Sequence, residues 1–214
     1  CEDYLGLFTY LGRSYGVPVA TDYTPQWANH SKNHSWCGVI RGDSTYHYTV
    51  GGWLSPVKER KFTYKLSKVY RRMSSIQPES LAARLRLSEL PPALRSPRIK
   101  DVSAEYMPVT AVSISGLFRA GRSKHVFLCC FDDKDWVAVS GEKRRGSDVT
   151  VPDMGYPAVY LPAYYAEGTL VPAQYPVLVD SSAVPHTLRP DTDRLRAVHL
   201  KRKFMDLRAR QFAD

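Results

Sequence analysis

The sequence predicts an α+β protein in which a helix and a few strands precede an antiparallel β-sandwich. One amphipathic helix is expected near the start of the 214-residue chain, and a long series of short strands begins at about residue 99. Strands that are separated by Gly, Pro and Asp turns are typical of a sandwich. We place the regions at 1–56 for the N-terminal part, 57–98 for a basic connector and 99–214 for the sandwich.

Residues 2–15 predict the helix. Apolar side chains with helical spacing form one stripe on it, at Tyr4, Phe8, Leu11 and Tyr15. Gly16 ends the helix, and Pro18 prevents its continuation. Cys1 stands at the amino end, where unpaired amide N–H groups and the helix dipole favour an anion and lower the pKa of a thiol.

Two strands are expected next, over residues 17–21 and 33–40, and a turn at 41–44 leads into a hairpin partner. His34 and Trp36 share a face of their strand because strand side chains alternate. The Trp36 indole can then shield one side of the His34 imidazole, while the imidazole faces the start of the helix. A thiolate and a general base need this arrangement.

The connector and the sandwich are predicted from further local patterns. Alternating residues over 62–70 indicate an edge strand, and a proline in the first turn indicates a helix over 78–87. The strands expected in the sandwich span residues 102–106, 111–117, 126–131, 136–139, 149–151, 158–165, 169–171, 177–179 and 196–201. Residues 132–135 contain three aspartates, but they lack the spacing of a calcium loop and predict a hairpin turn.

Three features occur together in roughly the first 55 residues: a cysteine at a helix start, the segment 11–20 (LGRSYGVPVA) that closes the helix, and His34-Ser35-Trp36 on a following strand. With them, this part resembles the transglutaminase-like branch of the papain-type cysteine enzymes. The whole chain resembles secreted bacterial proteins in which such a core precedes a β-sandwich. The segments that carry this narrower resemblance are residues 24–27, 33–36, 101–106 and 159–165.

The resemblance implies roles for individual residues. Cys1 would be the nucleophile and His34 the base. In the family an aspartate orients the imidazole, but the corresponding residues 48–52 contain no carboxylate, so Asp43 is the nearest candidate. A turn aspartate can instead bind its own backbone. The substrate-binding candidates are Gln26, Trp27 and Trp36.

The function expected from the resemblance is acyl transfer through a thioester. The Cys1 thiolate would attack the carbonyl of a peptide or protein amide, and His34 would take the thiol proton and then protonate the leaving amine. Hydrolysis and transamidation both remain open, and neither needs a metal or a cofactor. An extracytoplasmic location also follows from the resemblance alone. Because the family has helices before its cysteine, we expect the chain to be a fragment.

Other interpretations stay open. The missing acid can mark an inactive site, in which case the chain is a binding or structural protein whose sandwich engages a glycan or a protein. Cys1 could also be an amino-terminal nucleophile that uses its own amine, or a lipid attachment point. Tyrosines that could stack on sugar rings, or pack in the core, stand at Tyr156, Tyr160, Tyr164 and Tyr165.

Charge and composition limit which classes of function and partner are expected. The net charge of +9 is concentrated in residues 57–98 and 194–214, but no nucleic-acid fold signature accompanies it, so a solvated connector is the favoured interpretation and no nucleic-acid partner is expected. The four cysteines form no metal or disulfide pattern, and adjacent Cys129 and Cys130 should point to opposite faces of a strand. No apolar run is long enough to span a membrane.

Overall fold

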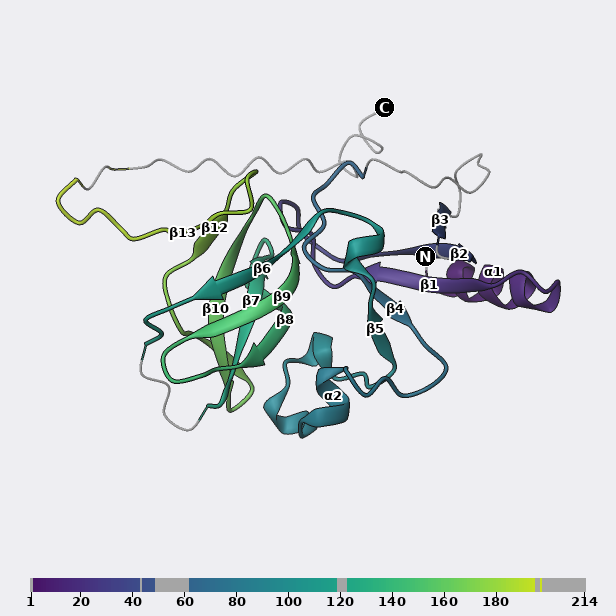
Figure 1. Cartoon of the computed structure of the whole chain (residues 1–214), viewed down its shortest axis with the longest axis horizontal. Coiled ribbons are helices and arrows are strands. Elements are labelled where there is room, and N and C mark those ends of the chain that lie inside the picture. Colours follow the sequence, from purple (N-terminus) through teal and green to yellow (C-terminus); the bar gives the residue numbers. More distant parts are fainter. Residues whose placement is uncertain (1, 43, 49–61, 119–122, 195–196, 198–214) are drawn as a thin grey trace, which may run out of the picture.

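A computed structural model describes residues 2–42, 44–48, 62–118, 123–194 and 197. Within these ranges the chain forms two α-helices, three short 3₁₀ helices and thirteen strands. The strands make a five-stranded sheet, a six-stranded sheet and a two-stranded sheet, and every pairing is antiparallel. Figure 1 shows the five-stranded sheet beside the other two, with α1 at its outer end.

The five-stranded sheet has the order β3-β2-β1-β4-β5. Its strands are β1 (Val19–Thr24), β2 (His34–Arg41), β3 (Ser44–Tyr48), β4 (Tyr70–Arg72) and β5 (Ile99–Asp101). The sheet therefore combines strands from all three regions that the sequence suggested. Helix α1 (Glu2–Ser14) packs on one face, where Leu5 is buried with Val19 and Cys37.

The remaining strands form the β-sandwich. They are β6 (Val109–Ile114), β7 (His125–Phe131), β8 (Trp136–Lys143), β9 (Val149–Gly155), β10 (Ala158–Ala166), β11 (Thr169–Pro172), β12 (Val177–Val179) and β13 (Pro185–Thr187). The β6-β9 sheet packs against the sheet of order β13-β12-β10-β7-β8, and one apolar cluster fills the space between them. Its fully buried members include Val112 from one sheet and Leu128 from the other.

The connector covers the opposite face of the six-stranded sheet. It contains α2 (Leu81–Arg84), followed by the 3₁₀ helices η1 (Leu87–Glu89) and η2 (Pro92–Leu94). Leu90 and Leu94 are buried there against Phe127 and Cys129. Cys130 faces the sandwich core instead, which confirms that the two adjacent cysteines point to opposite faces. The connector is thus packed structure and not only a solvated link.

The α+β prediction, with a papain-like core, is wrong, because the described chain is mostly antiparallel β-sheet. The only long helix among the described residues is α1, with 13 residues, while α2 has 4. The strand expected over 102–106 is instead the 3₁₀ helix η3 (Ser103–Glu105), and the edge strand over 62–70 is reduced to β4. The sandwich and the β7–β8 hairpin turn at 132–135 agree with the sequence. The strand expected over 196–201 lies almost wholly outside the described residues.

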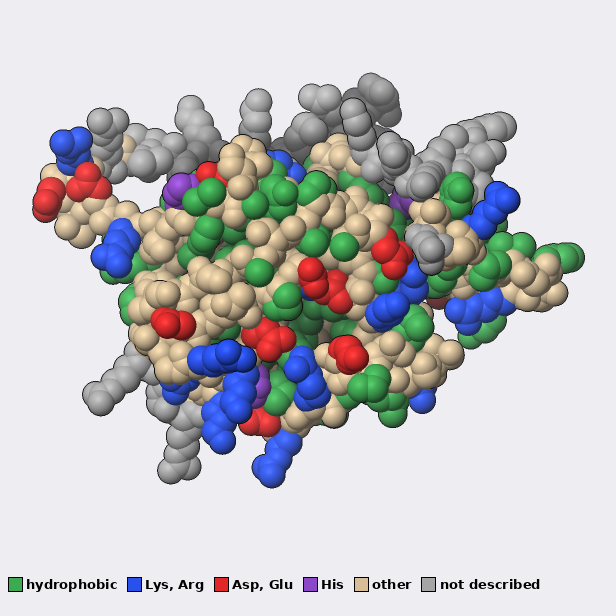
Figure 2. Space-filling view, viewed as in Figure 1, with side chains coloured by type: hydrophobic (Ala, Val, Ile, Leu, Met, Phe, Trp, Pro, Cys, Tyr) green, Lys and Arg blue, Asp and Glu red, His purple; other side chains and the backbone are tan. Residues whose placement is uncertain are grey.

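The surface of α1 is unusually apolar. Several of its large side chains are exposed, among them Tyr4, Leu7 and Tyr10, which are 62%, 52% and 76% exposed. Figure 2 shows hydrophobic side chains along this end of the molecule. The predicted stripe is therefore wrong as a core-facing surface, because Tyr4, Phe8, Leu11 and Tyr15 are all exposed, and Leu5 supplies the buried contact with the sheet instead.

Gly155 joins the sandwich to the rest of the chain, and its substitution should destabilise the fold. Its N–H donates to the Ser67 carbonyl, and a Cβ here would lie 2.5 Å from the Leu66 carbonyl oxygen and 2.7 Å from Met107 Sδ. We expect Gly155→Ala to lower the free energy of unfolding by about 1 to 3 kcal/mol, measured by urea denaturation. Gly6→Ala in α1 is the matched control. It meets no atom within 4 Å and should stabilise the protein slightly. Equal effects of both variants would contradict the packing argument.

Candidate functional site

Of the three predicted catalytic residues, the structure describes only His34. Helix α1 begins at Glu2, directly after Cys1, but Cys1 and Asp43 lie outside the described residues. His34 is the first residue of β2, and its ring stacks on Trp27 with 5.5 Å between ring centroids. His34 and Trp36 share a face as expected, with their rings 5.8 Å apart.

That shared face is turned away from the helix. Helix α1 packs on the face that carries Val19 and Cys37, whereas Trp36 is paired with Asp22 and belongs to the opposite face. Side chains alternate along β2, so His34 belongs to the face of Trp36. The structure therefore does not turn the imidazole toward α1, contrary to the geometry that we expected.

The predicted substrate-binding residues are interior side chains. Trp36 is fully buried, and Trp27 and Gln26 are 6% and 1% exposed. The two indoles pack in one apolar cluster with Leu66, Val69 and Val102. The Gln26 side-chain amide donates to the carbonyls of His30 and Phe131, over 2.8 and 3.3 Å, and so ties the β1–β2 loop to the sandwich. Their described role is packing, and contact with a substrate stays a prediction.

A buried charge network lies on the same face as Trp36. Arg71 donates from Nε and Nη2 to the two carboxylate oxygens of Asp22, over 2.9 and 2.8 Å, and from Nη2 to Glu105 over 2.8 Å. The Tyr106 hydroxyl donates to Asp22 as well, over 2.5 Å. Burial opposes the charge of Arg71, but its bonds to Asp22 and Glu105 outweigh this effect and raise its pKa. Burial and the charge of Asp22 raise the pKa of Tyr106.

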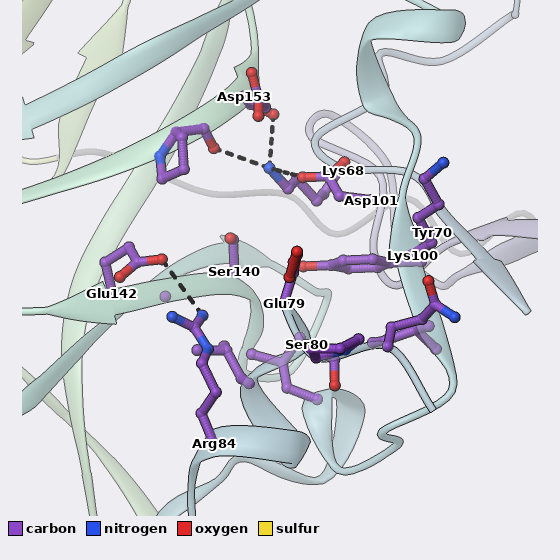
Figure 3. Close-up of a pocket in the computed structure, with 17 residues that line it drawn as sticks. Lys68, Tyr70, Glu79, Ser80, Arg84, Lys100, Asp101, Ser140, Glu142 and Asp153 are labelled. Atoms are coloured by element: carbon purple, nitrogen blue, oxygen red, sulfur yellow. Dashed lines mark hydrogen bonds and ion pairs between the residues drawn. The ribbon is translucent and has the colours of Figure 1, made fainter. Parts of the chain in front are cut away.

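A cavity lies where the five-stranded sheet, the connector and the sandwich meet. It encloses about 560 Å³ between β4 and β5 on one side, the start of α2, and strands β8 and β9 on the other. Figure 3 shows charged and hydroxyl side chains from each of these elements around it. We call it the junction cavity. No residue that lines it was a candidate in the sequence analysis, because its parts are far apart in the chain.

Lys68 fixes one wall of the junction cavity. Its side chain is 2% exposed, yet its ammonium group has three partners. It lies 2.5 Å from Asp101 Oδ2 and donates to the carbonyls of Pro152 and Asp153 over 2.9 and 2.8 Å. Burial lowers the pKa of Lys68, while the charge of Asp101 acts in the opposite direction. A lysine has three N–H groups, so all of them are used in this wall.

The other walls mix polar and apolar groups. Arg84 lies 3.7 Å from Glu142, and Figure 3 shows these two side chains extending toward each other across the cavity. The Ser80 hydroxyl accepts a hydrogen bond from the Ala83 N–H and so caps α2. Apolar surface comes from Leu81, Leu94 and Ile99. The cavity therefore presents carboxylates, cations and an apolar wall together.

Comparison with known proteins assigns neither a family nor a function to this chain. No family model, curated protein or solved structure matches the chain. Among the described residues, no helix combines the length and the apolar character that a membrane crossing requires.

Removal of the Asp22 carboxylate should strongly destabilise the protein. Asp22→Ala would leave Arg71, which is 6% exposed, without its bidentate partner, and breaking a buried ion pair costs about 3 to 5 kcal/mol. Urea denaturation measures this loss. Asp193→Ala is the control, because Asp193 is exposed and bonded only within its own turn. A loss below about 1 kcal/mol for Asp22→Ala, the range of an exposed pair, would show that the network does not hold the sheet together.

Proposed function

We propose that this protein is a binding protein whose junction cavity holds a carbohydrate. The observation that carries the proposal is the 560 Å³ cavity with its mixed lining. Its volume falls within the range of about 300 to 1,000 Å³ that is usual for small-ligand sites. An extracytoplasmic location, which the family resemblance suggests, is part of the proposal and would expose the protein to glycans.

The chemistry of the lining supports a sugar more than a purely charged ligand. Sugar hydroxyls both donate and accept hydrogen bonds, so they suit a cavity that offers carboxylates and cations side by side. Glu79 and Glu142 can accept from hydroxyls, and Lys100 can donate to them. The C–H groups of a sugar ring can pack against Pro78 and Leu81, which keep exposed surface at the cavity. The lining holds four acidic and three basic side chains, so its charges nearly cancel and give little preference for a highly charged molecule.

The tyrosines considered earlier for sugar stacking contribute less to this proposal. Tyr160 and Tyr164 are buried, and their hydroxyls donate to the carbonyls of Gly155 and Phe118. Tyr165 is half-buried and lines a separate groove of about 420 Å³ beside Trp136. The junction cavity and this groove lie along the same strand, β8, so a longer glycan could contact both.

Calorimetric titration tests the proposal. The probes are maltose, cellobiose, lactose and N,N′-diacetylchitobiose, each titrated into the full chain. We expect at least one of them to bind, and Glu79→Gln to weaken that binding about tenfold, because a hydrogen bond to a charged group contributes about 1.5 to 3 kcal/mol. Glu79 is exposed at the cavity, so its substitution should leave the fold intact.

Glu167→Gln is the matched control for this titration. It makes the same charge change at an exposed turn between β10 and β11, outside the junction cavity. The proposal predicts unchanged affinity for this variant. Absence of binding for all four disaccharides, or the same weakening in both variants, would overturn it.

A cysteine-dependent acyl transferase is a second candidate. The observation that favours it is that α1 begins at Glu2, so Cys1 directly precedes a helix, where a thiolate is stabilised. The helix runs antiparallel to β1, since Thr9 contacts Thr21 while Gly12 approaches Val19. Its amino end therefore lies toward the end of β1 that pairs with His34, although the His34 side chain belongs to the opposite face of the sheet. Peptide or protein amides would be the substrates of this candidate.

Thiol alkylation against pH separates the two candidates. Burial raises the pKa of Cys37 and Cys129 and raises that of Cys130 to about 12, so these thiols should react slowly in the folded protein and Cys1 should dominate. Acyl transfer predicts a Cys1 pKa below about 8.5 that rises in His34→Ala. His186→Ala on β13 is the control and should have no effect. An ordinary pKa that His34→Ala does not change would remove the acyl-transfer candidate.

A further inference from the structure

The groove beside Trp136 is built from three elements and is mostly apolar. It encloses about 420 Å³ between the start of β8, the connector residues at the start of η2, and the hairpin of β10 and β11. Among the residues that line it, polar side-chain groups come from Asp135, Trp136, Tyr165 and Thr169, and the others are prolines, aliphatic residues and a glycine. We call it the aromatic groove, after Trp136 and Tyr165.

The fold holds the Trp136 wall of the aromatic groove in place. The Trp136 ring meets that of Phe131 edge to face, with 5.4 Å between the ring centroids. The Trp136 backbone N–H donates to the Asp135 carboxylate over 2.7 Å, which ties the wall to the β7–β8 turn. Phe131 is 56% exposed and extends the aromatic surface beyond the groove.

The Tyr165 wall is also fixed. Its ring lies edge-on to the buried Phe127 ring, and its hydroxyl accepts a hydrogen bond from Arg95 Nη2 over 3.2 Å. A hydroxyl that accepts from an arginine keeps its own proton, so Tyr165 can still donate to a ligand. Both aromatic side chains are half-buried, so each keeps a surface to offer. Walls that are positioned in advance lower the entropy cost of binding.

The charge beside the aromatic groove is acidic. Asp135 is exposed and is the single charged residue among those that line the groove. Its turn, residues 132–135, holds three aspartates and one lysine, and Glu167 directly precedes the lining residue Gly168. Within the described part of the chain, neither Asp135 nor Glu167 forms an ion pair. A positive charge on a ligand would therefore be attracted to this side of the groove.

We propose that the aromatic groove docks a proline-rich peptide that carries a basic residue. Segments rich in proline form an extended polyproline II helix before they bind, and they dock in grooves lined by aromatic residues. Their carbonyls can accept from the Trp136 indole N–H and the Tyr165 hydroxyl, and an arginine or lysine can pair with Asp135.

The apolar lining favours such a peptide over a glycan in this groove. Proline has no backbone N–H, so a proline-rich segment places few donors against an apolar wall. A sugar would place several hydroxyls there, and each hydroxyl that loses water without a new partner costs free energy. The inference does not rest on the proposed carbohydrate site, because the linings of the aromatic groove and the junction cavity share no residue.

Calorimetric titration into the full chain tests the inference. The probes are a peptide of sequence PPPRPPPR with blocked ends and its counterpart PPPEPPPE. We expect the arginine peptide to bind and to shift the indole N–H resonance of Trp136. The glutamate peptide should bind about tenfold more weakly or not at all, because its charge opposes that of Asp135. Trp136→Leu should weaken binding of the arginine peptide at least about tenfold, since it removes a wall of the groove.

Asp135→Asn tests the charge without loss of packing. Asparagine keeps an oxygen that can accept from the Trp136 N–H, so the fold should be retained while the arginine peptide binds about threefold to fivefold more weakly. Asp148→Asn is the matched control, because it makes the same change in an exposed turn between β8 and β9, outside the groove. It should leave the affinity unchanged. Glu79→Gln should also have no effect, which separates this test from that of the carbohydrate site.

Three results would overturn the inference. The first is absence of binding by the arginine peptide, and the second is equal affinity for the two peptides or equal weakening by Asp135→Asn and Asp148→Asn. Cellohexaose, titrated in parallel, supplies the third. A shift of the Trp136 indole resonance by cellohexaose and not by the arginine peptide would assign the groove to a glycan.

Discussion

The bidentate contact between Asp22 and Arg71 is the interaction on which the arrangement of the chain depends. It joins β1 to β4, two strands that share only two paired residues. Strand β4 in turn pairs with β5, and both strands line the junction cavity. A buried guanidinium cannot exchange its carboxylate partner for water, so the contact fixes the register of a pairing that is otherwise too short to be stable. The junction cavity depends on this contact for its geometry.

Periodicity and turn residues in the sequence correctly predicted the elements that depend on neighbouring residues in the chain. The helix before Gly16, the strand that begins at His34, and most strands of the sandwich follow from periodicity and turn residues. The same patterns could not predict β4 and β5, because each has three residues and is held by partners far along the chain. They also led to the wrong fold class, since the papain-like assignment depended on a resemblance and on two helical patterns, of which α2 keeps only four residues.

The surroundings of His34 could also be predicted from the sequence only in part. Alternation along a strand says that His34 and Trp36 share a face, which the structure confirms, but it does not say which face a helix will cover. The helix takes the opposite face because the packing there is close. A Cβ on Gly12 would lie 2.5 Å from the Val19 side chain, so glycine allows α1 to approach β1. The other face is already filled by Trp36, Tyr106 and the Asp22 network, none of which leaves room for a helix.

The charged residues around β4 differ in whether the fold uses their hydrogen-bond donors. Arg71 and Lys68 are buried, and each is surrounded by acceptors that use its donors. Lys100 is exposed on β5 and borders the junction cavity. A charge whose donors are all used in the fold has none left for a ligand, whereas an exposed charge at the rim of a cavity can exchange water for one. The basic connector that the sequence identified is therefore not uniform, because Lys68 and Arg71 are buried in the fold while most of its other charges are exposed.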